Sequence, residues 1–433
     1  MEHEAVRLLS EYLKLDTTNP PGNEEKGVRF FATIFDAEGI EYKTYESKPK
    51  RGSIRAIIKG TGEKAPLTLL NHIDVVPANA EEWSFDPFSG EVVDGMIRGR
   101  GALDMKGQGI LELMAFLAIK RRGITPNRDL IFIAVADEEM GGELGMEWLL
   151  KNHPEDFPKG TVINEIGFTL TDLLPGCPLT MVAPAEKGPC WLRLVRKGEP
   201  GHGSMPHDNN ALHLMIEALG RLMAAERPVI ITPITAEYFK NLAVGWEFLK
   251  PYAEDGKEET LVEVLTSSGL LAMPQMKAVV TNTLSVNKLI AGDKTNVIPS
   301  HAEAELDIRL LPGQKIDDFI SFVREKLADD QIEIEVIHAT EASWSSMDTD
   351  DYRTMLDIIS KHNPDAVVTP WLIAGTTDSR FYREVGADAY GILPVSIPMA
   401  HIKMIHGIDE QISVENMVTG TDVFTEIVTT LCT

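Results

Sequence analysis

Two hydrophobic patterns alternate along the first part of the chain. Apolar residues spaced three or four positions apart predict helices over residues 4–15 and 24–39, and again from Gln108 to Gly123 and from Gly142 to Lys151. Between the helices, short continuous apolar runs predict buried strands in "SIRAIIKG", "LTLLNHID", "DLIFIAVADEE" and "TVINEIG". Strands of this kind, alternating with helices, are typical of an α/β sheet that is covered on both faces.

The pattern changes near residue 187. The segments "CWLRLVRKG", "AEAELDIRL" and "IEIEVIH" alternate apolar and polar residues. From Ala302 to Ile308, every second residue is apolar and the residues between them are charged. One apolar face and one solvent-exposed polar face predict an antiparallel sheet with helices on one side only. We therefore expect an inserted α+β domain over residues 188–338, with residues 1–187 and 339–433 together forming the α/β domain.

The composition is that of a globular protein with acidic charge. A length of 433 residues favours two domains, and a net charge of −25 argues against nucleic acid and anionic membrane surfaces as partners. The three cysteines have no CxxC spacing, so any metal ligands are expected to be His, Asp and Glu. The first residues lack the regions of a secretory signal, and the apolar runs are too short to span a membrane. We therefore expect a cytoplasmic protein.

Polar side chains stand at the ends of successive predicted strands and glycine-rich turns, in the order His72, Asp74, Asp104, Glu138, Glu139, Glu165 and His406. Ligands of an α/β sheet bind beyond the carboxyl ends of its strands, so these groups are expected to converge. Converging carboxylates repel one another unless cations balance them. Two imidazoles and three carboxylates, one of them bridging, suit a pair of zinc ions at a hydrolytic site.

Each of these residues also has an ordinary structural explanation. A His-x-Asp pair is usually incidental, and two adjacent glutamates are more often a solvated helix start. Asp104 lies among glycines and could belong to a turn, Glu165 could pair with a base, and His406 could be a loop histidine. The combination favours a metal site, because the polar groups follow strands or turns in order and no cysteine competes with them.

The adjacent pair Glu138–Glu139 indicates how such a site could work. Neighbouring side chains point in different directions, so one glutamate can bind metal while the other faces the substrate water. A carboxylate beside a metal-activated water can take its proton as a general base. Asp74, two residues after His72, is expected to hold that imidazole in the correct tautomer.

Seven segments, taken in order, resemble a known family of metallohydrolases. They are "NHIDVVP", "WSFDPFSGEVVDGMIRGRGALDMKGQG", "ADEEMGG", "GEPGHGSMP", "NVIPSHAEAELDIRLLPG", "AGTTDSRF" and "MIHGIDE". The family is that of the dizinc amidohydrolases and carboxypeptidases, which includes aminoacylase, acetylornithine deacetylase, succinyl-diaminopimelate desuccinylase and glutamate carboxypeptidase. "INEIG" and "HGIDEQI" are most similar to its carboxypeptidase S branch. The resemblance implies a zinc-peptidase-like catalytic domain with a central mixed β-sheet flanked by helices, plus an inserted lid and dimerisation domain with an antiparallel sheet.

The resemblance also implies a ligand set for two zinc ions. His72 and Glu165 bind one ion, Glu139 and His406 bind the other, and Asp104 bridges the two. In this family the peptide bond that follows the bridging aspartate, here Asp104–Met105, is cis. Cobalt or manganese could take the place of zinc, because availability as well as affinity decides occupancy.

Further residues match the family's catalytic and substrate groups. Glu138 matches the general base, and His202 matches a histidine that crosses a homodimer to stabilise the oxyanion in the partner's site. Residues that match the substrate-holding groups are Asn296, Arg309, Gly375, Thr376 and Arg380. From the residues alone, His202 could be a loop residue, Arg309 could form a rim ion pair, and Arg380 could pair with Asp378.

Three functions compete on this basis. The first is a metal-dependent hydrolase that cleaves an amide bond next to a free carboxylate, in an N-acyl amino acid or a short peptide, with Arg309 clamping the carboxylate. The second is an aminopeptidase on the same scaffold, against which Arg309 argues. The third is a non-catalytic metal-binding relative, which would have lost the base, whereas Glu138 is present. The segment from about 226 to 280 either shapes the pocket or the dimer, or packs simply as helices.

Overall fold

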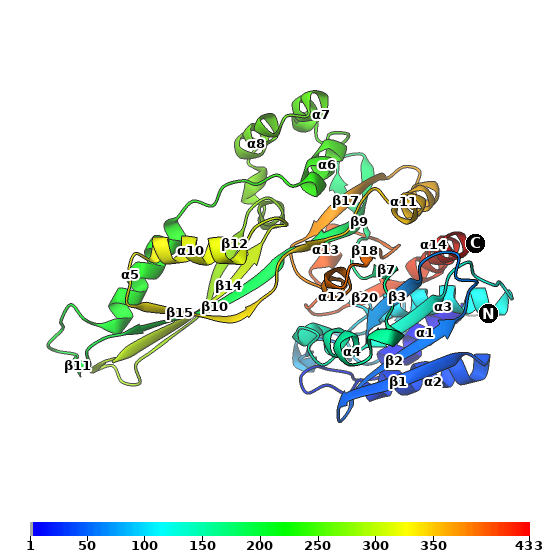
Figure 1. The fold of residues 1–433 in the computed structure, drawn as a ribbon, viewed down its shortest axis with the longest axis horizontal. Helices are drawn as coiled ribbons and strands as arrows, with labels where there is room; N and C mark the ends of the chain where they lie inside the picture. The colour runs from blue at the N-terminus through cyan, green and yellow to red at the C-terminus, as the bar shows by residue number, and fades with distance from the viewer. Residues whose placement is uncertain (1–2) are drawn as a thin grey trace.

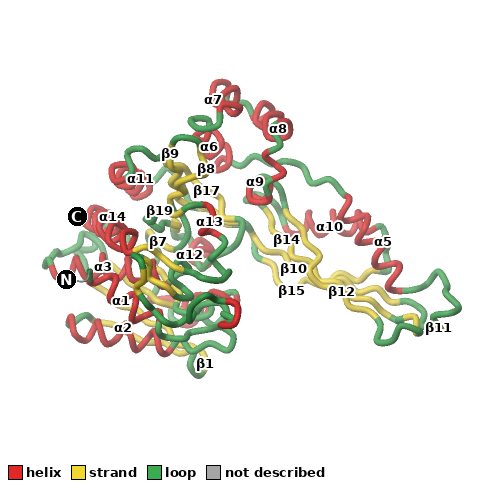
Figure 2. Tube along the Cα trace, turned by 180° about the vertical axis from the view of Figure 1, so that it is seen from behind, coloured by secondary structure: helices red, strands yellow, loops and turns green. Residues whose placement is uncertain are grey.

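The computed structural model describes residues 3–433, which form a larger body and an elongated arm (Figures 1 and 2). The body holds an 11-stranded sheet and the ends of the chain, and the arm is built on a separate four-stranded sheet. A mixed central sheet flanked by helices, together with a separate antiparallel sheet, is the architecture that the sequence predicts, and it is confirmed.

The central part of the large sheet positions the candidate site. Strands β3 (Leu67–His72), β6 (Leu130–Val135) and β7 (Thr161–Asn164) run parallel, so their carboxyl ends lie at one edge of the sheet. The other strands of this sheet are β1 (Glu41–Lys48), β2 (Arg51–Ile58), β8 (Thr169–Leu174), β9 (Cys177–Glu186), β16 (Ser343–Trp344), β17 (Val367–Ile373), β18 (Asp388–Gly391) and β19 (Ser396–Ile397). Strands β1 and β2 pair antiparallel, which makes the sheet mixed.

Strand β6 is buried on both faces, as its unbroken apolar sequence predicts. Leu130 and Phe132 face one core, and Ile131 and Ile133 face another. The first core is shared with α1 (Glu4–Leu13), α2 (Glu25–Glu38), α3 (Lys106–Arg121), α11 (Asp350–His362) and α14 (Val414–Cys432). The second core is shared with α4 (Met146–Asn152) and α12 (Ser379–Glu384). Helices therefore cover both faces of the sheet.

The arm has one apolar and one wet face. Its strands are β10 (Gly188–Lys197), β12 (Thr283–Ala291), β14 (His301–Leu310) and β15 (Ile332–Ala339), all paired antiparallel. Ala302, Ala304, Leu306 and Ile308 are buried beneath α5 (Ala211–Ala224) and α10 (Ile316–Leu327), while the residues between them are partly exposed. The period-two prediction for β14 is thus confirmed.

Two small sheets complete the strands. At the far end of the arm, β11 (Gly201–His202) pairs with β13 (Val297–Ile298). In the body, β20 (Gln411–Ser413) pairs with β5 (Met96–Arg98), which pairs with β4 (Val92–Val93). A short helix, α13 (Met399–Ile402), precedes the loop that carries His406.

The segment from 226 to 280 packs on the body rather than on the arm. It forms helices α6 (Pro233–Leu242), α7 (Lys250–Asp255), α8 (Glu258–Ser267) and α9 (Pro274–Ala278). Tyr238 and Phe239 belong to the core of the large sheet, and the Tyr238 ring meets Trp371 of β17 edge-on at 5.1 Å between centroids. Domain boundaries at residues 187 and 339 are our proposal. The segment from 226 to 280 falls between these boundaries in the sequence, but its helices pack on the larger body.

Candidate active site

His72 ends strand β3 and is almost fully buried. Its Nδ1 lies 2.9 Å from the main-chain oxygen of Asp74, and its Nε2 lies 3.0 Å from Oδ1 of Asp104. The carboxylate of Asp74 is more distant from the ring, at 3.7 Å. The main-chain oxygen is therefore the nearer partner of the imidazole, and a proton on Nδ1 leaves the Nε2 lone pair free to bind a metal.

The Asp104 carboxylate lies between two groups of metal-ligating side chains. Its Oδ2 is 3.2 Å from Nε2 of His406, which is also 3.1 Å from Oε2 of Glu139. On the other side, Nε2 of His72 is 3.9 Å from Oε2 of Glu165. The structure thus brings together one group with His72 and Glu165 and another with Glu139 and His406, and Asp104 belongs to both.

A buried glutamate that the sequence analysis left unassigned holds the Asp104 loop. Glu410 accepts hydrogen bonds from the backbone N–H groups of Gly101, Leu103 and Asp104, and it forms an ion pair with Arg100 at 2.7 Å. Glu410 stands in the segment "HGIDEQI", four residues after His406, so one acidic side chain joins the loops of two candidate ligands. The Asp104–Met105 peptide bond is cis, as the family resemblance implies.

The Asp74 carboxylate organises the loop that follows β6. Its two oxygens accept the backbone N–H groups of Glu138 and Glu139, each at 3.2 Å. These two residues begin a short 3-10 helix, Glu138–Met140, which turns the neighbouring side chains in different directions. Glu139 is thereby turned toward His406. Glu138 lies near enough to Glu165, His72 and Glu139 for their charges to act on its carboxyl group.

Three residues with left-handed backbone conformations lie at the site. Asp137 precedes Glu138 with φ at 76°, Ile166 follows Glu165 with φ at 68°, and His406 itself has φ at 58°. A β-branched residue such as isoleucine is rarely found in this conformation. Strained residues persist where the surrounding structure determines them, and they cluster at functional sites. The backbone strain therefore supports the same location that the side chains indicate.

The site holds more carboxyl groups than the neighbouring basic side chains can neutralise. Burial, followed by the charge of Glu165, raises the pKa of Glu138 well above its usual range. Burial and the charge of Asp104 likewise raise the pKa of Glu165. Hydrogen bonds to Asp104 and Glu139 raise the pKa of His406 to about 10. Burial opposes ionisation of Asp104, but its bonds to His406 and His72 outweigh that effect and hold its pKa below its usual range.

These residues fit a pair of divalent cations. Asp104 offers one oxygen to each group, and both imidazoles direct Nε2 toward it. Glu139 Oε1 is buried and has no hydrogen-bond partner among the described residues, which leaves it available as a ligand atom. Imidazole and carboxylate groups are the ligands that zinc takes where no thiolate is present, and the cations would balance the acids that crowd the site.

Arg309 and Thr376 meet where the arm joins the body. Arg309, near the end of β14, forms an ion pair with Asp307 at 2.7 Å, and its Nη1 lies 3.5 Å from Thr376 Oγ1. Gly375 is exposed beside Thr376, with open space around the position of a Cβ atom. The guanidinium of Arg309 is partly exposed, so it remains accessible to a ligand at this junction.

Arg380 is held differently from Arg309. It is 4% exposed, and it donates hydrogen bonds to the main-chain oxygens of Thr377 and Gly141. The Gly141 contact ties helix α12 to the loop that carries Glu138. Asp378 forms no hydrogen bond with Arg380, and its two oxygens are buried without partners among the described residues.

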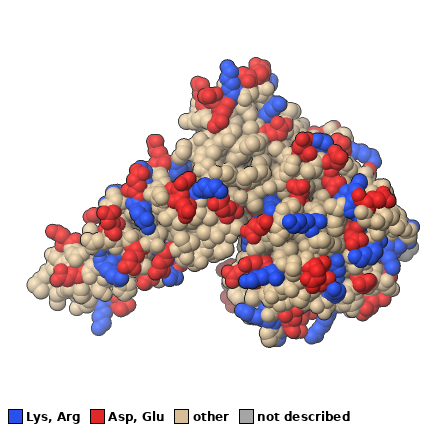
Figure 3. Space-filling model, viewed as in Figure 1, with Lys and Arg blue, Asp and Glu red and all other residues tan. Residues whose placement is uncertain are grey.

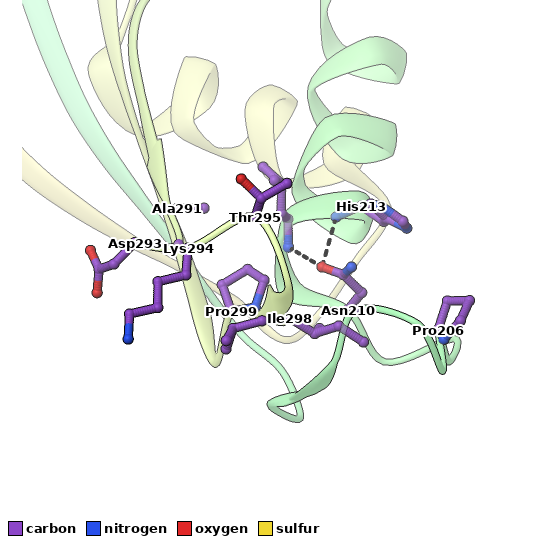
Figure 4. A pocket seen from close by; sticks show the side chains of 13 residues that line it. Pro206, Asn210, His213, Ala291, Asp293, Lys294, Thr295, Ile298 and Pro299 are labelled. Carbon is purple, nitrogen blue, oxygen red and sulfur yellow. Dashed lines mark hydrogen bonds between the residues drawn. The ribbon is translucent and has the colours of Figure 1, made fainter.

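His202 and Asn296 lie at the far tip of the arm. His202 is exposed and pairs with Val297, and the main-chain oxygen of Asn296 accepts the N–H of Gly203. A cavity of about 480 Å³ opens beside them, and Figure 4 shows Asn210 on its wall, capping α5. The structure therefore brings His202 and Asn296 together but does not bring them to the candidate metal ligands of the same chain, because the length of β14 separates them.

A model of peptidase family M20/M25/M40 matches residues 68–430 of the chain. The chain belongs to this family. It is 30% identical to human N-fatty-acyl-amino acid synthase/hydrolase PM20D1 over 89% of this chain and 78% of that protein. It is 29% identical to probable carboxypeptidase S-like 2 of Dictyostelium discoideum over 83% of this chain and 70% of that protein. As a member of M20, the protein is an enzyme of the metallohydrolase class.

The fold agrees with the M20 assignment. The crystal structure of the M20 metallo-carboxypeptidase Sso-CP2 from Sulfolobus solfataricus superposes with a TM-score of 0.71, at 19% identity and over 98% of both chains.

Within residues 3–433 of this M20 chain, no helix has the length and apolar character needed to cross a membrane.

Proposed function

We propose that the protein hydrolyses an amide bond next to a free carboxylate, in N-acyl amino acids or short peptides. One observation carries the proposal. Five side chains that suit two metal ions, and a sixth that suits a general base, meet at one edge of the sheet: His72, Asp104, Glu139, Glu165, His406 and Glu138. A guanidinium for the substrate carboxylate, that of Arg309, stands where the arm joins this body.

The proposed metals are two zinc ions, with cobalt or manganese as substitutes. His72 and Glu165 would hold one ion, Glu139 and His406 the other, and Asp104 would give one oxygen to each. When bound, the cations supply Lewis acidity toward the scissile carbonyl and lower the pKa of a water molecule. The remaining chemistry belongs to the side chains of the protein.

Glu138 is the proposed general base. It takes a proton from the attacking water and later gives it to the leaving amine. A carboxyl group that first accepts and then gives a proton works best with a pKa near the working pH, and burial raises the pKa of Glu138 in that direction. Asp74 holds Glu138 in place through the backbone rather than through its side chain.

Arg309 is the proposed anchor for the substrate carboxylate. Its planar guanidinium matches the two oxygens of a carboxylate, and Thr376 and Gly375 offer a hydroxyl and open space beside it. Arg380 supports the same loop from within, through its bonds to Thr377 and Gly141. A carboxylate bound here fixes which amide bond of the substrate reaches Glu138.

A homodimer is part of the proposal. His202 and Asn296 lie at the tip of the arm, too distant to act in their own chain, and Figure 3 shows an open notch between arm and body that a second arm could enter. His202 would then stabilise the oxyanion in the partner's site, and Asn296 would help to hold the substrate. The dimer would form through the arm, which serves as a lid.

The substrate class rests on the relatives as well as on Arg309. Their names specify N-fatty-acyl-amino acids for one and a carboxypeptidase for another, and both substrate types place an amide beside a carboxylate. Nucleic acid and membrane surfaces are not expected partners, since acidic and basic side chains are interspersed over the face in Figure 3. A cytoplasmic location is proposed from three cysteines that are all free.

A matched substrate screen tests the proposal. The zinc-loaded protein is given N-acetyl amino acids, long-chain N-acyl amino acids and dipeptides, and each compound is paired with its C-terminal amide, which lacks the carboxylate. We expect hydrolysis of the acids and a loss of at least about tenfold in kcat/KM for the amides. Equal hydrolysis of both members of each pair would refute carboxylate recognition, and cleavage that depends instead on a free amine would indicate an aminopeptidase.

A further inference from the structure

We propose that Arg51 is a positioning residue for catalysis, which acts through Asp137 on the loop that carries Glu138. The inference rests on the proposed function, because it concerns how the proposed base is aimed. Arg51 is the first residue of β2, is 9% exposed, and belongs to none of the motifs that carry the family resemblance.

Arg51 joins two buried acids from distant parts of the chain. Its Nε and Nη2 donate to the two oxygens of Glu24, at 2.9 and 2.7 Å. The same Nη2 donates to Oδ1 of Asp137 at 2.6 Å. Glu24 is fully buried and Asp137 is 4% exposed. The bidentate contact with Glu24 fixes the plane of the guanidinium, so Arg51 presents its donor to Asp137 from a set direction.

Asp137 links the Arg51 contact to the conformation of the Glu138 loop. It has a left-handed backbone conformation directly before Glu138, which a non-glycine residue adopts at a cost. Its Oδ1 accepts from Arg51, and its Oδ2 accepts the N–H of Leu144 at 2.8 Å. The side chain thus spans the turn from 137 to 144, so the direction in which Glu138 leaves the turn depends on where Arg51 holds Asp137.

A second branch of the same hydrogen-bond network reaches the Glu138 loop through Asn19. Asn19 donates to Asp137 Oδ1 at 3.2 Å and to Asp74 Oδ2 at 2.8 Å. Asp74 in turn accepts the backbone N–H groups of Glu138 and Glu139. Arg51, Asp137, Asn19 and Asp74 are therefore linked in one buried chain of hydrogen bonds that ends on the main chain of the proposed base.

The stretch "NPPGNEE" is shaped around this arginine. It supplies both Asn19 and Glu24, and at Gly22, between them, a Cβ atom would lie 2.5 Å from Arg51 Nε. Only glycine permits that approach, since φ at Gly22 is also 86°. A buried ion pair is weak evidence for stability, because apolar residues of similar size often do as well. Two buried acids around one arginine are better explained by the geometry that they impose on the loop.

A second buried ion pair, at the opposite end of β6 from Asp137, provides a matched control. Arg128 precedes β6 and forms a bidentate pair with Asp351, at 2.6 and 3.0 Å, whereas Asp137 follows β6. The variants are R51K and R51M, with R128K and R128M as controls, each measured for kcat, KM, zinc content and Tm. Lysine keeps the charge but loses the bidentate fork.

We expect R51M to lower kcat by about 10- to 100-fold with KM changed by less than about threefold, because a displacement on the order of 1 Å has effects of this size. R51K should recover part of the loss. R128M and R128K should lower Tm while kcat stays within about twofold. If R51M does not fold, the comparison of R51K with R128K decides the question, and equal kcat values would overturn the inference.

A double-mutant cycle separates this inference from the proposed function. In an E138Q background, R51M should cause no further loss of kcat, because both changes act on one group. An undiminished further loss would show that Arg51 acts elsewhere and would overturn the positioning role. Near-normal turnover by E138Q alone would instead overturn the proposed base, whatever R51M does.

Discussion

His72 and His406 direct their Nε2 atoms at the two oxygens of a single carboxylate, that of Asp104, at 3.0 and 3.2 Å. The two histidines are separated by most of the sequence, and His72 is buried while His406 is largely exposed. One carboxylate that serves two imidazoles from opposite sides is the geometry of a bridging ligand. It explains why the acids of this site can be ionised together when two cations are present.

The proposed bridging role of Asp104 predicts different metal losses for different ligand variants. Asp104→Asn should lose both zinc ions, since it removes charge from both groups, whereas Glu165→Gln should lose mainly one. We expect affinity to fall by at least about 10- to 100-fold for each affected ion. Metal content per chain after dialysis, measured by elemental analysis, checks this. Equal stoichiometry in the two variants would contradict a bridging carboxylate.

The proposed role of Glu138 as general base predicts a loss of turnover without a loss of metal. Glu138→Gln should keep its zinc and lose roughly three or more orders of magnitude in kcat, because a glutamine cannot take the proton of the water. Glu143→Gln, in the same loop but exposed, is the matched control and should retain activity. Near-normal kcat in the first variant would refute the assignment.

Metal binding should release protons in a pH-dependent way. Because hydrogen bonds to Asp104 and Glu139 raise the pKa of His406 to about 10, its imidazole carries a proton at neutral pH in the metal-free protein. A metal must displace that proton, so affinity should rise with pH between about 6 and 8. Calorimetry in buffers of different ionisation enthalpy measures the release. H406N should release fewer protons, and an unchanged number would count against this account.

Carboxylate recognition predicts an effect on binding more than on turnover. Arg309→Lys should raise KM for carboxylate substrates by about tenfold with a smaller change in kcat, because an ammonium lacks the bidentate fork. Arg193→Lys, on the neighbouring strand and also in an ion pair, should have little effect. Steady-state kinetics with an N-acyl amino acid and its amide decides whether the loss is specific to the carboxylate.

The position of His202 at the tip of the arm predicts complementation between inactive variants. H202A and E138Q should each be inactive, but a re-equilibrated mixture should regain up to about a quarter of wild-type activity, since half the dimers then contain one complete site. E138Q mixed with a second base variant, E138A, provides the control without recovery. No gain in the first mixture would argue against action across a dimer.

Some strands follow from their own sequence pattern and others do not. Strands β3, β6 and β7 are buried at every position because both of their faces are covered, and β14 alternates because only one of its faces is covered. Strands β1 and β12 were not predicted, since they lie at sheet edges and most of their residues are at least partly exposed. Their pairing depends on neighbours and not on their own pattern.

Within the site, residue type and order predicted which side chains come together, and long-range contacts hold their loops in place. Glu410 holds Asp104 across 306 residues, and Arg51 holds Asp137 across 86. Neither contact can be recognised from the sequence around it, because each partner looks like an ordinary charged residue and the two lie far apart in the chain. Asp74 was expected to steady His72, and its carboxylate bonds the backbone of Glu138 and Glu139.

The sequence by itself determined the two kinds of sheet and the metal-ligating residue types, because hydrophobic period and side-chain chemistry are local properties of the chain. Only the tertiary structure decided that Asp104 stands between His72 and His406, that Arg51 reaches the loop of Glu138, and that His202 lies far from its own chain's site. Those facts depend on which strands become neighbours and on how the arm projects, and such pairings arise from the burial of the whole chain together.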